Sequence, residues 1–298
     1  MSQTAFFLIL ASVVLHAGWH VLSKSRRPRY GFFMAMSTAL AAAMSPFLVA
    51  SGVWRLEAPG RLWLCVVGGG LSGAVYVIGL SYAYRFADIA QAYPLTRALP
   101  VLLTAAVTGL TGWGRELGWT ALGGMAVISA GCLLLPLPSW RRFRLDAYWN
   151  PGMLGILAAV VGSTAYTVID SHGVRLMQET VGSDLVGAGA YSCLRELTIL
   201  AAVTTVCLLR REERAALSWD LLRHPHPYLS GVFAGAAYLL VLLAMRHVDN
   251  VSYVQAFRQM SLPVGFLMGV LLLKEKVTAM QVVSVALILG GLLLVYLG

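Results

Sequence analysis

The chain has 298 residues, of which 58% are hydrophobic and only 12% are charged. Its mean hydropathy is +0.75, and a soluble domain of this length could not cover so apolar a sequence with polar surface. The formal net charge of +9 comes from basic residues between the apolar runs, a pattern that membrane insertion produces. Composition therefore excludes an ordinary soluble domain, and we expect a lipid bilayer rather than nucleic acid as the partner.

Apolar windows predict an all-α integral membrane protein with ten transmembrane helices. We end the sixth helix at Asp170 and Ser171, so that His172 begins a loop, and we expect Pro263 to loosen the ninth. The ten spans lie near residues 4–23, 32–54, 62–84, 89–110, 118–137, 152–170, 185–209, 228–246, 251–273 and 278–297.

The spans divide into two related halves. Residues 1–138 form the first five-helix repeat, 139–151 a linker, and 152–298 the second repeat. Because five is an odd number, the second half must enter the bilayer from the opposite side. This predicts a 5+5 inverted repeat around a central cavity, an arrangement that lets a carrier expose one site to each side in turn.

Polar residues that recur at a fixed offset carry most of the evidence for the duplication. At an offset of 147, Trp19 falls on Tyr166. The other pairs, at offsets of 161 and 159, are Arg85 with Arg246, Asp88 with Asp249, Arg97 with Arg258, and Glu116 with Glu275.

Two segments that run from a proline to a glutamate resemble a known family. Leu99-Pro100-Val101-Leu102-Leu103 leads to Arg115-Glu116, Leu262-Pro263-Val264-Gly265-Phe266 leads to Lys274-Glu275, and a glycine-bearing helix follows each. They resemble the signature that ends the fourth and ninth helices of the drug/metabolite transporter superfamily, EamA-like branch, although the proline-to-glutamate distance is 16 residues in one copy and 12 in the other. The resemblance implies a ten-helix alternating-access carrier. Members of that superfamily handle amino acids, nucleotide sugars, organic phosphates and drugs, so no substrate is implied.

Ionisable residues inside the spans are the first candidates for a substrate site, because each costs about 2.5–3.5 kcal/mol near the bilayer centre. Arg97 and Arg258 lie at least seven residues inside apolar runs and recur across the repeat, so we assign them to a cavity. Arg195 and Glu196 are further candidates, and a structural ion pair explains Arg195 equally well.

Aromatic and amide side chains accompany these arginines. Tyr93 precedes Arg97 by four residues, and Gln255 and Gln259 flank Arg258; their donors converge only where the helix face points inward. Tyr76 and Tyr238 lie on the glycine-rich third and eighth spans, where they either line the cavity or fill it.

A second cluster occupies the first span. His16 and His20, four residues apart, share a helix face, and Trp19 is nearby. Tyr166 is the counterpart of Trp19 in the second half. Packing, a proton or substrate contact, and a metal site all fit this spacing. No acidic residue completes a zinc site, so we expect neither a metal nor a cofactor.

These features predict a secondary transporter for a small anionic or zwitterionic metabolite of the amino acid, organic acid or phosphate type. The reason is that intramembrane arginines outnumber the acids. An exporter of amphipathic cations or drugs is the alternative, using the aromatics and Glu196. An intramembrane enzyme using His16, His20 and Asp170 is an alternative of another class, but no nucleophile motif supports it and we expect no enzyme.

The sequence also bears on the energy source and on the location of the protein. No nucleotide-binding loop is present in the sequence, so coupling falls to the substrate gradient, a proton or an exchange partner. We expect a multi-pass protein of the bacterial inner (plasma) membrane. The substrate, the direction of transport, the orientation of the termini and the oligomeric state stay open.

Overall fold

The computed structural model is all-helical. It describes the backbone of residues 2–23, 30–86, 89–135, 137, 151–215, 217, 223–273 and 277–298, without the side chains of 17–23, 89–94, 269 and 272–273. The helices of the first half are α1 (Gln3–Ser23), α2 (Tyr30–Ser51), η1 (Val53–Arg55), α3 (Gly60–Phe86), α4 (Ile89–Thr111) and α5 (Trp119–Leu134). Those of the second are α6 (Gly152–Val181), α7 (Asp184–Leu209), α8 (Arg211–Ala215), α10 (Pro225–Met245), α11 (Val251–Phe257), η4 (Arg258–Met260), α12 (Ser261–Leu273) and α13 (Ala279–Leu297).

Six helical segments of the described chain are long and apolar enough to cross a membrane. They are Tyr30–Arg55, Gly60–Phe86, Gly152–Val181, Asp184–Leu209, Pro225–Met245 and Ala279–Leu297. Shorter apolar segments cover Gln3–His16, Leu95–Thr111 and Trp119–Leu134. The chain is therefore an all-helical protein with several candidate transmembrane helices, as its composition predicts.

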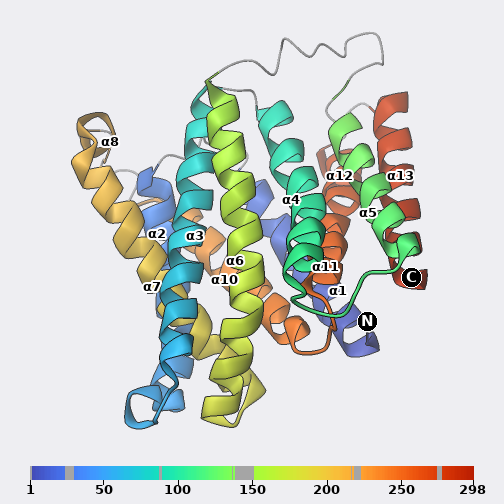
Figure 1. Cartoon of the computed structure of the whole chain (residues 1–298). Coiled ribbons are helices and arrows are strands. Elements are labelled where there is room, and N and C mark those ends of the chain that lie inside the picture. The colour runs from blue at the N-terminus through green and yellow to red at the C-terminus, as the bar shows by residue number, and fades with distance from the viewer. Residues whose placement is uncertain are drawn as a thin grey trace.

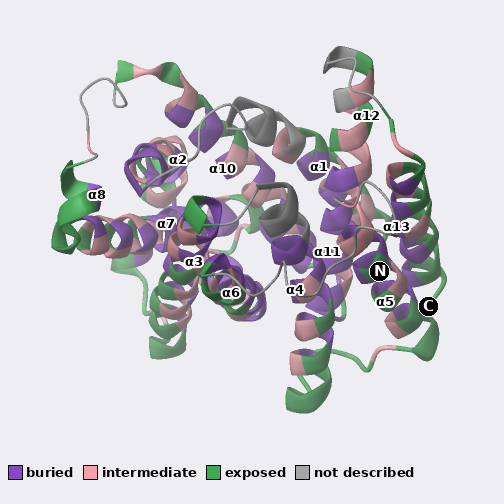
Figure 2. Ribbon diagram, turned by 90° about the horizontal axis from the view of Figure 1, so that it is seen from above, coloured by how far each residue is buried: buried purple, intermediate pink, exposed green. Residues whose placement is uncertain are grey.

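The helices α2, α3, α6 and α7 lie on one side of the molecule and α5 and α13 on the other, with α1, α4, α10 and α11 between them (Figure 1). Seen from above, buried residues gather on the faces that the helices turn toward one another, and exposed residues lie around the rim (Figure 2). The two termini lie close together.

The sixth helix is longer than predicted. Its expected end at Asp170 and Ser171, with a loop from His172, was wrong, because α6 continues to Val181. Gly182 ends it with a φ of 74°, a left-handed conformation that glycine adopts without steric cost. Asp170 consequently lies well inside the helix.

Polar residues in the second half of α6 find partners within the protein, which explains why the helix does not stop where its hydropathy falls. The Arg175 guanidinium donates to the carbonyls of Met245 at 2.9 Å and Val248 at 2.8 Å, where α10 ends. The last carbonyls of a helix have no partner within that helix. Arg175 therefore satisfies α10 while remaining helical itself.

The ninth predicted span is not continuous. The 3₁₀ turn Arg258–Met260 separates α11 from α12. Pro263 lacks the N–H that would donate to the carbonyl of Gln259, four residues earlier, and a proline ring also crowds that carbonyl. The helix tightens at this point, and the turn carries Arg258.

Close backbone contact holds α3 against α6. A Cβ atom at Gly155 would lie 2.5 Å from the backbone nitrogen of Ala83 and 2.6 Å from the carbonyl oxygen of Gly79, and one at Gly162 would lie 2.6 Å from the backbone nitrogen of Tyr76. Lipid is as apolar as leucine, so helix association in a membrane relies on close packing, and small residues permit it. Glycine at these positions lets the two helices meet along much of their length.

We expect Gly155→Ala to destabilise the protein, because its new methyl group would overlap the backbone of α3. Overpacking of this kind costs about 1–3 kcal/mol. Gly123→Ala on α5 is the matched control, since its Cβ meets open space and alanine favours a helix. Thermal unfolding in detergent should show a lower midpoint for Gly155→Ala only; an equal response of the two variants would contradict the close contact.

Candidate functional site

A buried ion pair joins α6 to α7. Asp170 is 0% exposed, and its Oδ2 lies 2.7 Å from Nε of Arg195. Two phenols donate to the same carboxylate: the Tyr191 hydroxyl to Oδ1 at 2.7 Å, and the Tyr238 hydroxyl to Oδ2. A carboxylate removed from water costs several kcal/mol unless it is paired and hydrogen-bonded. These three groups supply the partners that Asp170 requires.

The Arg195 guanidinium is held between two aromatic rings. Its Cζ lies 4.8 Å from the centroid of the Tyr166 ring and 4.7 Å from that of Tyr238, within the range of cation–π attraction. A Cβ atom at Gly73 would lie 2.9 Å from Nη2 of Arg195, so glycine on α3 leaves the room for this group. The orientation of Arg195 is therefore fixed by α3, α6 and α10 together.

Glu196 follows Arg195 on α7 and faces α2. Its Oε1 accepts a hydrogen bond from the Ser37 hydroxyl at 2.5 Å, and its Oε2 lies 3.6 Å from Nη1 of Arg195. Neighbouring side chains on a helix point about 100° apart, and the length of the arginine side chain bridges the difference. Glu196 has fewer partners than Asp170 has.

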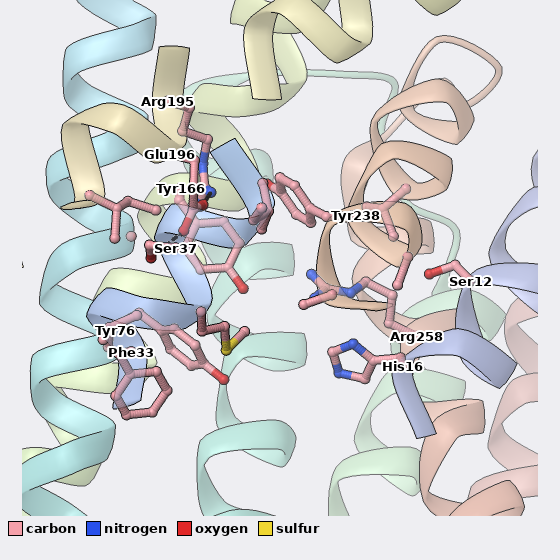
Figure 3. A pocket seen from close by; sticks show the side chains of 18 residues that line it. Ser12, His16, Phe33, Ser37, Tyr76, Tyr166, Arg195, Glu196, Tyr238 and Arg258 are labelled. Atoms are coloured by element: carbon pink, nitrogen blue, oxygen red, sulfur yellow. Dashed lines mark hydrogen bonds and ion pairs between the residues drawn. The ribbon is translucent and has the colours of Figure 1, made fainter. Parts of the chain in front are cut away.

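These groups border a cavity of about 110 Å³ (Figure 3). A water molecule occupies about 30 Å³ of liquid, so the volume suits a few waters or a solute of a few heavy atoms. Asp170 does not line the cavity. The polar side chains that do are Ser12, His16, Ser37, Tyr76, Tyr166, Arg195, Glu196, Tyr238 and Arg258.

Arg258 extends into the cavity from the side of α1 and α11, with His16 beside it, whereas Glu196 and Tyr76 face it from the other side (Figure 3). Its guanidinium lies 3.5 Å from Oε1 of Gln255 and 5.9 Å from the centroid of the Tyr238 ring. No carboxylate in the described part of the chain pairs with it. Arg258 therefore presents a positive charge to the cavity.

Arg97, the predicted counterpart of Arg258, is buried but does not line the cavity. Its Nη2 donates to the Ser261 hydroxyl at 2.9 Å, and that hydroxyl donates to the Arg258 carbonyl at 2.9 Å. One serine therefore connects the two arginines. Arg97 supports the turn that carries Arg258.

The two glutamines also lie behind the cavity. Oε1 of Gln255 accepts from Thr167 at 3.4 Å, in addition to Arg258, and Nε2 of Gln259 donates to the Gln255 carbonyl at 3.0 Å. Both side chains are buried. They brace the turn rather than line the cavity.

The remaining predicted residues divide into two groups. His16, Tyr76, Tyr166 and Tyr238 line the cavity, and the ring of Tyr166 packs edge to face against Tyr76 and Tyr238 at centroid distances of 5.8 and 6.2 Å. The side chains of Trp19, His20 and Tyr93 lie outside the described residues. Among the residues that the structure describes, no group of three or more His, Cys, Asp or Glu side chains could hold a metal ion.

Asp170, Ser37 and Tyr191 belong to this site but were not selected as site residues from the sequence, and neither was Ser12, which lines the cavity. Asp170 was placed at a helix end because the sixth span was drawn too short; a carboxylate inside a longer apolar run was the available signal. Ser37 and Tyr191 carried no signal of their own, because isolated hydroxyl residues are common in apolar helices. Only the packing of α2, α6 and α7 brings them to the carboxylates.

Comparison with known proteins supports the fold alone. No protein-family model matches the chain, and no curated protein matches it. One solved structure, described only as the crystal structure of a protein, has a TM-score of 0.73 and 18% sequence identity to this chain, covering 100% of this chain and 98% of the other. At that identity the two proteins share a fold. The fold and site together define a helical protein with candidate transmembrane helices around a buried polar cavity.

We expect Asp170→Asn to lower the stability strongly, because it leaves the Arg195 charge buried without its nearest carboxylate. Removing one member of a buried pair costs about 3–5 kcal/mol. Adding Arg195→Gln should recover part of this loss, since the double variant contains neither charge. Thermal unfolding of the wild type, the two single variants and the double variant forms a complete cycle. Strict additivity of the two losses would show that the pair does not act as a unit.

Proposed function

We propose that the protein is a secondary transporter that moves a small anionic or zwitterionic metabolite across a bacterial inner membrane by alternating access, as an EamA-like member of the drug/metabolite transporter superfamily. The observation that carries the proposal is the position of Arg258. It is a buried guanidinium that faces a central cavity and pairs with no described carboxylate. A charge kept in that position at such cost is expected to serve a ligand.

The charges of the site favour an anionic group on that ligand. Asp170 and Glu196 both lie against Arg195, so the two carboxylates share one guanidinium and leave Arg258 for the ligand. Arginine presents planar paired donors that match a carboxylate or a phosphate. The expected excess of arginines over acids inside the spans becomes smaller once Asp170 is counted inside α6, yet Arg97, Arg195 and Arg258 still outnumber Asp170 and Glu196 there. The third buried acid, Glu213, lies on the short helix α8 beyond α7.

Helix neighbours support the proposed 5+5 inverted repeat. If α1, α2, α3 and α5 correspond to α6, α7, α10 and α13, the most extensive contacts between the halves should have counterparts, although the contact of α6 with α7 has none of similar extent between α1 and α2 in the described residues. The contact of α3 with α6 is matched by that of α10 with α1, and the contact of α3 with α7 by that of α10 with α2. The self-related pairs α2 with α7 and α5 with α13 are also in contact, as expected beside a two-fold axis.

Two glycines that the predicted offset of 161 relates support the same repeat. A Cβ atom at Gly70 would meet the Arg195 carbonyl on α7, and one at Gly231 would meet the Met36 carbonyl on α2. Met36 and Arg195 then correspond at an offset of 159, and the next residues are Ser37 and Glu196. Their hydrogen bond at 2.5 Å would lie on the two-fold axis between the repeats.

The direction of the helices agrees with inversion. From one end of the α2–α7 interface to the other, Ser37 meets Glu196, Ala41 meets Cys193 and Phe47 approaches Gly189. Rising numbers on α2 therefore meet falling numbers on α7, so these two corresponding helices run antiparallel. Corresponding helices of two repeats that enter the membrane from opposite sides must do so.

The alternative of a cation exporter depends on aromatic faces and a carboxylate in the cavity. Glu196 is present there, but Arg195 already occupies one face of the Tyr166 ring and one face of the Tyr238 ring. A ligand cation would also approach Arg258. We therefore favour a ligand with a negative group.

We expect the linker and the C-terminus to lie on opposite sides of the membrane. With ten spans, five of them lie between residue 139 and residue 298, so the two residues would be on opposite sides. If only the six longest helical segments crossed the membrane, four would lie between these residues, and both would be on one side. Single-cysteine variants Ser139→Cys and Gly298→Cys, with the four native cysteines replaced, would be labelled in right-side-out and inverted vesicles with an impermeant maleimide. Labelling of both cysteines from the same side would contradict the ten-span arrangement.

We expect Arg258→Ala to lose ligand binding while the protein still folds. Purified wild-type protein would be screened by thermal shift against amino acids, organic acids, organic phosphates and cationic drugs. An anionic or zwitterionic compound at 100 times its dissociation constant should stabilise the protein by about 2.7 kcal/mol, and Arg258→Ala should not respond to it.

The matched control is Arg246→Ala, which removes an exposed arginine that pairs with Asp184 at 3.1 Å. It should respond as the wild type does. Counterflow of the same compound in proteoliposomes then tests transport itself. If only cationic drugs stabilise the protein, and Arg258→Ala responds to them as the wild type does, the anion carrier is contradicted and the cation exporter is favoured.

A further inference from the structure

Two opposite charges face the cavity with incomplete partners. Glu196 has the Ser37 hydroxyl at 2.5 Å and Nη1 of Arg195 at 3.6 Å, but Arg195 is held more closely by Asp170, at 2.7 Å. Arg258 pairs with no described carboxylate. Since Asp170 and Arg195 offset each other, the charges that remain in the empty cavity are those of Glu196 and Arg258.

A bound anion would change this balance. A carboxylate or phosphate at Arg258 would place a second negative charge in the same cavity as Glu196, beside side chains that are themselves buried. Like charges repel strongly where water is excluded, and protonation of a carboxyl group removes the repulsion. A ligand that carries its own ammonium group would bring the compensating charge with it.

We propose that Glu196 takes up a proton when a small monoanion binds at Arg258, so that the cavity is loaded with the anion and the proton together. The inference rests on the proposed transport function and deepens it, because it assigns the coupling ion and the group that carries it. The proton enters from the same side as the anion and is released with it on the other side. The loaded and empty cavities then carry the same net charge.

The other titratable groups around the cavity are less suited to this task. Asp170 already pairs with Arg195 and accepts from two phenols, and it does not line the cavity. Tyr76, Tyr166 and Tyr238 line the cavity as phenols, and the Tyr238 hydroxyl already donates to Asp170. The Cys193 thiol, on the α2 side of α7, donates to the Ala41 carbonyl at 3.4 Å.

His16 is the competing proton acceptor, because it lines the same cavity on the side of Arg258. An imidazole titrates near neutral pH, but its cationic form would stand beside another cation. Glu196 therefore remains the group whose protonation the anion favours most directly, and His16 must be tested beside it.

The contact between Glu196 and Ser37 gives the proton a structural consequence. An ionised carboxylate can only accept hydrogen bonds, whereas a protonated one also donates. Uptake of a proton therefore changes the bond that joins α7 to α2, the helices that correspond in the proposed repeat. Movement of the two halves against each other would pass through this contact.

Calorimetry on the full chain in detergent tests the inference, with L-lactate and L-alanine as matched probes. Both have three carbons, but alanine has an ammonium group where lactate has a hydroxyl. Titrations in two buffers of different ionisation enthalpy count the protons taken up. We expect about one proton per bound lactate and none per alanine, and a lactate affinity that falls about tenfold per pH unit once the free carboxyl is ionised.

Glu196→Gln should take up no proton with lactate, and its lactate affinity should no longer depend on pH. Glu179→Gln, which alters an exposed carboxylate on the same helix as Asp170, is the matched control and should retain the uptake. Proton uptake that persists in Glu196→Gln, or that disappears in His16→Gln, would overturn the assignment to Glu196.

The inference and the proposed function fail in different ways. Lactate binding without proton uptake in the wild type, or equal uptake with alanine, overturns the inference and leaves the anion site at Arg258 in place. Absence of binding by lactate and by inorganic phosphate, in the wild type as in Arg258→Ala, overturns the anion site and with it both proposals.

Discussion

A carboxylate and a guanidinium that are buried together between α6 and α7 constrain the rest of the site. Asp170 has no exposed surface, and in a medium of low dielectric constant neither it nor Arg195 can be left without a partner. Three helices besides α7 contribute to the arrangement: α6 supplies Asp170, α10 supplies Tyr238, and α3 supplies the space at Gly73. Any change in the position of one of these helices disturbs the pair.

The glycine contacts make that arrangement attainable. The ion pair requires α3, α6 and α7 to approach one another closely, and side chains larger than hydrogen at Gly79, Gly155 or Gly162 would hold the backbones apart. In lipid this closeness has to come from packing, because the apolar environment does not push the helices together. Local sequence and buried electrostatics therefore depend on each other at this interface.

Fixing Arg195 has a consequence for the cavity. Because its Nε lies 2.7 Å from Asp170 and its Cζ lies within cation–π distance of the Tyr166 and Tyr238 rings, it is a structural cation more than a ligand-binding one. Glu196 and Arg258 are then the charges that a solute would meet first. In the carrier that we propose, occupancy of the site would have to change the balance between the two proposed halves, and the contact between Ser37 and Glu196 is placed to respond to it.

The sequence by itself determined the class of protein, because long apolar runs leave no other way to bury so much hydrocarbon. The helix positions followed from the same runs, except at the end of α6, which continues to Val181. It also selected seven polar residues that line the cavity, because a polar group inside an apolar run is conspicuous. They are His16, Tyr76, Tyr166, Arg195, Glu196, Tyr238 and Arg258.

Tertiary structure decided which of these side chains meet. The end of α6 depended on Arg175 finding carbonyls on α10, and the break before α12 placed Arg258 on a turn. Arg97 and Arg258 were expected to share the cavity, yet Ser261 engages the first and leaves the second facing inward. Asp170 and Ser37 joined the site only through packing. These outcomes depend on contacts between residues far apart in the chain, and the periodicity of one helix contains no information about the face that its neighbour presents.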